Sequence, residues 1–224
     1  MIFVNFKTYP EGTGETAVKL AGICAKVAKT TGVKIIPVVQ AVDLWRLKES
    51  GLEVWAQHVD WQLPGQWTGF TNLEAVMRAG GQGTLINHAE HQLPPGTIKQ
   101  TIKRIESLRS LKVQGFKRFE IMVCCRTLGQ AEKLVKFKPD FIAYEPLELI
   151  GGEIAVSQTQ PAAIGHFVEM ADGIPVIIGA GIKEKKDVEI GLKLGAQGIL
   201  VASGVILADD PGQKLLELAE AFAR

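Results

Sequence analysis

The feature of this sequence that most constrains its fold is an alternation between short apolar runs and longer amphipathic segments, which continues from one end of the chain to the other. The apolar runs are rich in Val and Ile and are followed by Gly, Asn, Pro or charged residues. Runs of this kind are typical of parallel strands that are buried on both faces of a sheet. We predict strands at Ile2–Asn5, Ile35–Val39, Val54–Gln57, Thr84–Asn87, Phe119–Val123, Phe141–Tyr144, Pro175–Ile178 and Gly198–Val201.

The segments between these runs have the periodicity of helices. In Thr16–Thr30 and Thr97–Leu111 apolar residues recur at helical spacing, and Lys186–Leu194 and Gly212–Phe222 continue the series. The 224 residues contain no linker, repeat or change of composition that would divide the chain. We therefore predict one domain, residues 1–224, folded as a closed (β/α)₈ barrel, with a doubly wound open sheet as the alternative.

The charges are nearly balanced, with 25 Lys and Arg against 24 Asp and Glu, and they are scattered along the chain. This balance argues against binding to nucleic acid or to an anionic membrane. The sequence shows neither a signal peptide at its start nor an apolar run long enough to span a membrane, so we expect a cytoplasmic protein. Cys24, Cys124 and Cys125 lack metal-binding spacing and are expected to be buried reduced thiols.

Polar residues that follow the predicted strands indicate where chemistry takes place, because the active site of such a barrel lies at the carboxyl ends of its strands. Asn5 and Lys7 end the first strand, His88 follows the fourth, and Glu145 follows the sixth. A lysine can stabilise negative charge, a neutral histidine can polarise a carbonyl, and a carboxylate can remove a proton from carbon. We predict a proton-transfer site that uses no metal and no organic cofactor.

Two glycine-rich turns follow the last two predicted strands. They read Gly179-Ala180-Gly181 and Ala202-Ser203-Gly204, and each opens a helical segment. Backbone N–H groups at such turns are suited to a phosphate group. We therefore expect the substrate to be a small phosphorylated compound.

These residues carry a family resemblance over essentially the whole chain. The chain resembles the triosephosphate isomerase family, and within it the shorter archaeal-type branch, whose members are TIM barrels. The matching stretches are Asn5-Phe6-Lys7, Asn87-His88-Ala89-Glu90, Ala143-Tyr144-Glu145-Pro146, Glu148-Leu149-Ile150-Gly151, Ile178-Gly179-Ala180-Gly181-Ile182 and Leu200-Val201-Ala202-Ser203-Gly204.

The resemblance implies the interconversion of dihydroxyacetone phosphate and D-glyceraldehyde 3-phosphate in glycolysis and gluconeogenesis. By motif, Glu145 is the base that moves a proton between two carbons, and neutral His88 polarises the carbonyl. Lys7 supplies positive charge, Asn5 donates a hydrogen bond near the same oxygen, and Glu90 orients Lys7.

The resemblance also implies a lid, from Pro146 to about Val156, that closes over the phosphate. The residues expected to contact substrate there and in the glycine-rich turns are Ile150, Gly151, Gly179, Gly181, Ala202, Ser203 and Gly204.

The chain departs from the family pattern at a few positions. The lid tip reads Gly151-Gly152-Glu153, where the family commonly has Gly-Thr-Gly. Ala89 stands where serine is usual, and His91-Gln92 stands where an arginine often follows the glutamate. We expect these changes to affect lid kinetics and turnover rate more than the type of reaction.

The loop after the third predicted strand carries Trp61 and Trp67 on either side of Pro64-Gly65. Exposed aromatic residues at a loop tip indicate a contact surface. In the family this loop enters a pocket of a neighbouring subunit near the lysine, and Thr68-Gly69 resembles part of it. We therefore expect a homo-oligomer, either a dimer or a tetramer.

Two alternative functions stay open. One is another phosphate-binding barrel isomerase, against which Asn5 with Lys7 and Tyr144-Glu145-Pro146 argue. The other is a barrel that binds sugar phosphate without efficient turnover, which the changed lid tip favours. The remaining histidines, His58, His91 and His166, show no ligand spacing, so we predict no metal site.

Overall fold

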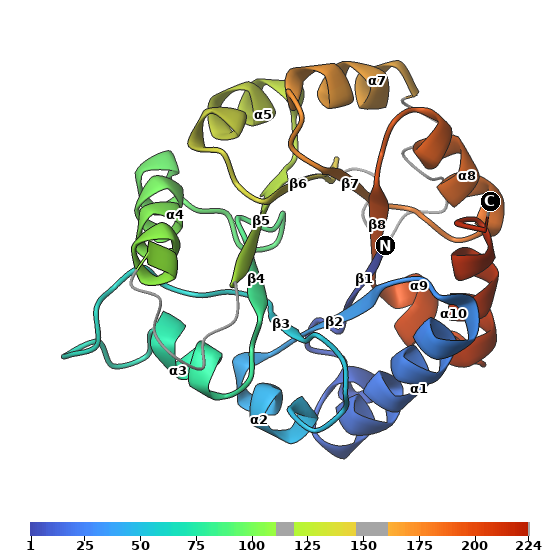
Figure 1. Ribbon diagram of the computed structural model, residues 1–224, viewed down its shortest axis with the longest axis horizontal. Helices are drawn as coiled ribbons and strands as arrows, with labels where there is room; N and C mark the ends of the chain where they lie inside the picture. Colours follow the sequence, from blue (N-terminus) through green and yellow to red (C-terminus); the bar gives the residue numbers. More distant parts are fainter. Residues whose placement is uncertain (111–118, 147–160, 224) are drawn as a thin grey trace.

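The computed structural model describes residues 1–110, 119–146 and 161–223, and within them eight parallel strands close into a barrel (Figure 1). Each strand pairs with the next, and β1 pairs with β8. The strands are β1 (Ile2–Asn5), β2 (Ile35–Val39), β3 (Trp55–Ala56), β4 (Gly83–Ile86), β5 (Glu120–Cys125), β6 (Phe141–Tyr144), β7 (Val176–Gly179) and β8 (Gly198–Val201). Closure confirms the predicted (β/α)₈ barrel and is incompatible with the open sheet.

Helices form a ring outside the barrel (Figure 1). The longer helices begin close to the predicted positions, as the apolar periodicity requires. The α-helices are α1 (Glu15–Thr31), α2 (Leu44–Leu47), α3 (Leu73–Arg78), α4 (Pro95–Ser110), α5 (Leu128–Leu134), α7 (Pro161–Met170), α8 (Lys185–Lys193), α9 (Ser203–Ile206) and α10 (Pro211–Glu220). Short 3₁₀ turns lie at Pro10–Gly12, Ala41–Asp43 and Val135–Phe137.

Local signals explain several helix ends. Asn72, Thr127 and Asp210 accept hydrogen bonds from N–H groups in the first turns of α3, α5 and α10. Helix α1 stops at Gly32, which has φ 70° and donates its N–H to Ala28 O. No helix in the described ranges is both long enough and apolar enough to cross a membrane.

The observed strands differ from the prediction mainly at their ends. β3 is shorter than the predicted Val54–Gln57, although the N–H of Gln57 still donates to Val39 O at 3.0 Å. β4 ends at Ile86 because Asn87 has φ 60°, which leaves the extended conformation. β5 runs on through Cys125, beyond the predicted end at Val123.

An aromatic cluster fills the interior of the barrel. The rings of Phe3, Trp55 and Phe141 meet edge to face, with centroids 4.9–5.8 Å apart. A Cβ on Gly83 would lie 2.2 Å from Trp55 Cε2, so glycine is required beside this ring. Because these residues pack the interior, the site described below is confined to the carboxyl ends of the strands.

Candidate active site

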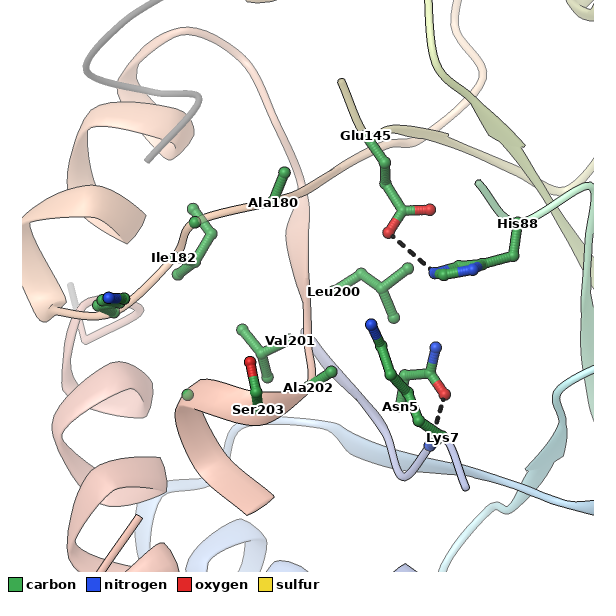
Figure 2. A pocket seen from close by; sticks show the side chains of 13 residues that line it. Asn5, Lys7, His88, Glu145, Ala180, Ile182, Leu200, Val201, Ala202 and Ser203 are labelled. Atoms are coloured by element: carbon green, nitrogen blue, oxygen red, sulfur yellow. Dashed lines mark hydrogen bonds and ion pairs between the residues drawn. The ribbon is translucent and has the colours of Figure 1, made fainter. Parts of the chain in front are cut away.

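A cavity at the carboxyl ends of the strands brings together most of the predicted site residues (Figure 2). Lys7, His88 and Glu145 lie on one side, and the turns after β7 and β8 lie on the other. We name these the catalytic side and the phosphate side, after the roles that we predicted for them from the sequence. The lining residues are Asn5, Lys7, His88, Glu145, Ala180, Gly181, Ile182, Lys183, Leu200, Val201, Ala202, Ser203 and Gly204.

Lys7 is held in place by its backbone and by its ammonium group. It has φ 48°, and its N–H donates to Asn5 Oδ1 at 3.0 Å while its carbonyl accepts from Gln57 Nε2 at 2.8 Å. Its Nζ forms an ion pair with Glu90 Oε1 at 2.6 Å. A positive φ in a residue with a side chain costs about 1–3 kcal/mol and persists where surrounding contacts fix it. Asn5 and Gln57 supply those contacts.

His88 follows Asn87, whose left-handed backbone turns the chain out of β4. The Asn87 amide donates to Cys124 O at 2.8 Å and accepts from the Leu93 N–H at 2.9 Å. His88 Nδ1 accepts the Glu90 N–H at 3.2 Å, and its Nε2 lies 3.4 Å from Glu145 Oε1. A ring nitrogen that accepts carries no proton, so the neutral imidazole bears its proton on Nε2, facing the cavity.

Glu145 is a buried carboxylate, 4% exposed. Its N–H donates to Cys125 O at 2.8 Å, which continues the pairing of β6 with β5. Within the described residues its Oε2 has no hydrogen-bond partner. One carboxylate oxygen is therefore engaged with His88 and the other is unsatisfied.

The pKa values of Glu145 and His88 depend on each other. Burial raises the pKa of Glu145, but His88, the Cys124 thiol and Lys7 together bring it below its ordinary value. Burial has the largest effect on the pKa of His88 and lowers it, but the charge and hydrogen bond of Glu145 and the charge of Glu90 together outweigh burial and raise the pKa. The hydrogen bond from the Glu90 N–H to His88 Nδ1 favours the neutral ring, because a protonated ring has no nitrogen left to accept it. The hydrogen bond identifies the tautomer of the neutral ring, and the charge of Glu145 makes that ring easier to protonate.

Gly179 contacts the side chain of Glu145. A Cβ at this position would lie 2.8 Å from Glu145 Cγ and 2.9 Å from Glu145 Oε1. Real Cβ atoms essentially never approach other atoms so closely. Gly179, which we predicted to contact substrate, adjoins Glu145 in the structure, and its missing side chain leaves room for that carboxylate.

The turn after β8 presents backbone donors to the phosphate side. The first hydrogen bonds of α9 are donated by Val205 and Ile206, both to Ala202 O at 3.0 Å. The N–H groups of Ser203 and Gly204 precede them, so they have no partner within the helix. A Cβ on Gly204 would lie 3.2 Å from Ile182 O, so the two turns of the phosphate side approach each other closely.

Some backbone N–H groups of the turn after β7 already donate hydrogen bonds within the protein. Ala180 and Gly181 have φ 82° and 71°, which bends the chain sharply into the turn. Asp187 Oδ2 accepts the N–H groups of Lys183 and Glu184 at 3.0 and 3.1 Å. Those donors are therefore occupied. Gly181, which we predicted to contact substrate, lines the cavity, and Lys183, which we did not single out from the sequence, lines it too.

Some predicted residues cannot be compared with the structure. Ile150 and Gly151, with Gly152 and Glu153 of the expected lid tip, lie outside the described residues. Glu90 contacts Lys7 as the resemblance implied, and Ala202 lines the cavity. Among the described residues, no group of three or more His, Cys, Asp or Glu side chains is placed to hold a metal ion.

A second cavity adjoins the catalytic side. It shares Asn5, Lys7 and His88 with the first cavity and is also lined by Thr8, Tyr9, Gln57, His58, Leu85, Glu90 and His91. The rings of His58 and His91, far apart in sequence, lie 4.6 Å apart, and His58 Nε2 is 3.1 Å from Asp60 Oδ1. The sequence offered no sign that these two histidines meet.

Comparison with known proteins identifies the family. The family model described as triosephosphate isomerase matches residues 1–222. Relatives named triosephosphate isomerase include those of Thermoplasma volcanium, 38% identical over 97% of this chain and 98% of the relative, and Methanobacterium bryantii, 40% identical over 97% and 95%. That of Methanothermobacter thermautotrophicus is 39% identical over 97% and 93%. The chain therefore belongs to the triosephosphate isomerase family of enzymes.

Proposed function

We propose that the chain interconverts dihydroxyacetone phosphate and D-glyceraldehyde 3-phosphate through an enediolate, with Glu145 as base, neutral His88 as electrophile and Lys7 as the stabilising cation. The observation that carries this proposal is the approach of Glu145 Oε1 to His88 Nε2 at 3.4 Å, in a cavity that also contains Lys7. The glycine-rich turns across that cavity offer a place for the phosphate.

The proton transfer balances with these groups alone. Glu145, held ionised by its lowered pKa, takes a proton from the carbon beside the carbonyl. The electron pair of that C–H bond forms a carbon–carbon double bond, and the carbonyl oxygen gains negative charge. The His88 Nε2–H donates to this oxygen, and Lys7 stabilises the charge. His88 gives its Nε2 proton to the former carbonyl oxygen and takes the proton of the neighbouring hydroxyl, whose oxygen becomes the new carbonyl. As that carbonyl forms, the electron pair of the carbon–carbon double bond takes the proton back from Glu145 at the neighbouring carbon.

A substrate bound between Glu145 and His88 changes the balance of their pKa values. The pair raises the pKa of His88 because the carboxylate faces the ring directly. When substrate atoms lie between the two side chains, the distance from the Glu145 carboxylate to the His88 ring increases, and the carboxylate raises the pKa of His88 less. The Glu90 N–H remains on Nδ1, which favours the neutral ring that this mechanism needs.

Lys7 and Glu90 form an ion pair in which only the Lys7 side chain is largely buried. The side chain of Lys7 is 15% exposed and that of Glu90 is 52% exposed. An ion pair with an exposed partner adds little stability. We therefore assign Glu90 the role of orienting the ammonium group, while the lid contacts of Ile150 and Gly151 stay predictions from the resemblance.

We also propose a homo-oligomer of single-domain subunits, dimer or tetramer. Leu63, Trp67 and Phe70 are exposed by 60%, 47% and 47%, and the rings of Trp67 and Phe70 stack edge to face at 5.6 Å. Trp61 is partly buried, so the apolar tip centres on Trp67 rather than on both tryptophans. Light scattering after size exclusion tests this, since a monomer at micromolar concentration contradicts it.

A coupled assay from glyceraldehyde 3-phosphate to dihydroxyacetone phosphate, run on the wild type and Glu145→Gln, tests the function. Removing a positioned base lowers kcat by about 10²–10⁴-fold, and we expect a loss in this range with the fold intact. Competitive inhibition by inorganic phosphate should persist in the variant, because the phosphate side is unchanged. A folded wild type that binds phosphate but shows no turnover would support the alternative of binding without catalysis and would refute the isomerase.

A further inference from the structure

Two glutamine side chains form a hydrogen-bonded chain behind His88. Gln92 Nε2 donates to Asn87 O at 2.7 Å and to His88 O at 3.1 Å. Gln92 Oε1 accepts from Gln130 Nε2 at 2.8 Å, and Gln130 Oε1 accepts the Arg126 N–H at 2.8 Å. We call Gln92 and Gln130 the glutamine relay.

The partners at the two ends fix the orientation of both amides. The carbonyls of Asn87 and His88 can only accept, so Gln92 must turn its NH₂ toward them. Its oxygen then faces Gln130, which must present its own NH₂ and so turns its oxygen toward the Arg126 N–H. A flip of either amide would place two donors or two acceptors face to face. The relay therefore has one consistent arrangement.

The relay connects the backbone on either side of the catalytic pair. Its far end is Arg126, which directly follows Cys125, and Cys125 O accepts the N–H of Glu145. Its near end holds the two carbonyls next to His88. The main chain that carries the electrophile is thus tied to the strand end that holds the base.

The backbone at the near end needs such support. Asn87 is in the left-handed region, at a cost of about 1–3 kcal/mol that only fixed surroundings sustain. The side chain of Asn87 fixes this turn through Cys124 O and the Leu93 N–H, and Gln92 fixes it through the carbonyls.

We propose that Gln92 and Gln130 are positioning residues that hold His88 at its working distance from Glu145. This inference rests on the proposed isomerisation. Neither side chain lines the cavity, so both act through the backbone of His88 and not by contact with substrate. A displacement of about 1 Å can cost about 10²-fold in rate, and a relaxed loop would displace His88 by less.

The first test is Gln92→Met, which removes both hydrogen-bonding groups and keeps the length of the side chain. We expect kcat to fall about tenfold, while KM and inhibition by inorganic phosphate change less than about twofold. The phosphate side, which binds the inhibitor, does not touch the relay. A lower melting temperature with kcat unchanged would assign Gln92 a structural role and overturn the proposal, as would parallel changes in kcat and phosphate inhibition.

Gln92→Glu gives a second readout, which a structural role would not move. The ionised carboxylate has no donor for the two carbonyls, whereas the protonated acid has one O–H. Relative to wild type, kcat of this variant should therefore recover as the pH falls from 8 to 5.5. A ratio that does not change with pH contradicts the proposal.

Controls separate this inference from the proposed function. Gln130→Met should lower kcat in the same way, and Gln92→Met with Gln130→Met should cost no more than the larger single effect, because both break one chain. Gln130→Met also replaces Gln92→Met if the latter fails to fold. Gln100→Met, on the exposed face of α4, should behave as wild type. Turnover by wild type that Glu145→Gln abolishes shows that the isomerase stands even where relay variants have no effect.

Discussion

The catalytic side and the phosphate side of the cavity are built in different ways. On the catalytic side the working groups are side chains, and each is fixed by a neighbour: Lys7 by Asn5 and Glu90, His88 by the Glu90 N–H, and Glu145 by His88. On the phosphate side the donors are backbone N–H groups of small residues in two turns. Proton transfer requires defined protonation states and distances, whereas anion binding requires donors and close approach.

The two turns of the phosphate side also differ from each other. Within the described residues, the N–H groups of Ser203 and Gly204 in the turn after β8 have no backbone partner, while the turn after β7 gives two of its N–H groups to Asp187. A buried carboxylate at the start of α8 also opposes a phosphate electrostatically. For the proposed anion, we therefore expect most N–H donors to come from the turn after β8, and the turn after β7 to add its remaining N–H groups and the charge of Lys183.

Among the variants, Gly179→Ala should affect the two sides most unequally, because it should lower kcat far more than it changes inhibition by inorganic phosphate. Its Cβ would meet Glu145 Cγ at 2.8 Å and Oε1 at 2.9 Å, so the carboxylate must move. We expect kcat to fall about 10²-fold, as for a displacement of about 1 Å, with inhibition by inorganic phosphate changed less than about twofold. Steady-state kinetics measure both quantities.

Gly165→Ala in α7 is the matched control for this substitution. A Cβ there meets nothing within 4 Å, and alanine stabilises a helix by about 0.5–1 kcal/mol over glycine. Its kinetics should equal those of wild type. If Gly179→Ala instead weakens phosphate inhibition and spares kcat, Gly179 belongs to the phosphate side, as the sequence analysis first assigned it.

A second experiment concerns the pKa of His88, which reports the coupling within the catalytic side. In wild type, burial lowers this pKa, and the charge and hydrogen bond of Glu145 together with the charge of Glu90 outweigh burial, so the net direction is upward from 6.5. Glu145→Gln removes the charge and leaves the burial, so the pKa of His88 should fall and the ring should stay neutral to lower pH. An NMR titration of the imidazole measures this.

Glu132→Gln removes an exposed carboxylate on α5 and is the control for that titration. It should leave the titration of His88 as in wild type. A pKa of His88 that stays the same or rises in Glu145→Gln would show that Glu145 is not the charge that controls the ring.

The barrel and the catalytic side were largely predictable from the sequence. Buried parallel strands produce continuous apolar runs, and polar residues that end them meet at one face of a barrel, so Lys7, His88 and Glu145 could be assigned together. The bend at Asn87 was not predictable, because a left-handed residue leaves no mark in the apolar pattern.

The contacts that depend on three-dimensional approach were beyond the sequence. Gln92 and Gln130 are 38 positions apart, and nothing in their spacing indicates that they bond. The role of Gly179 depends on where a carboxylate from another strand points. Lys183 stands two residues after the glycine-rich turn and could have been noticed as a cation, but its importance depends on Asp187 occupying nearby N–H groups.

Lys183→Met tests the phosphate side and should have the smallest effect of these variants. Lys183 lines the cavity, and Asp187 occupies the N–H groups of Lys183 and Glu184, so we expect any contribution of Lys183 to phosphate binding to come from its charged side chain. Lys183 is exposed, so screening limits its contribution. We expect KM and the inhibition constant for inorganic phosphate to rise about two- to fivefold, with kcat unchanged and the difference from wild type shrinking as salt increases. Lys186→Met, which removes a charge outside the cavity, should change neither constant; equal effects of the two variants would mean that the overall charge near α8, and not Lys183, attracts the phosphate.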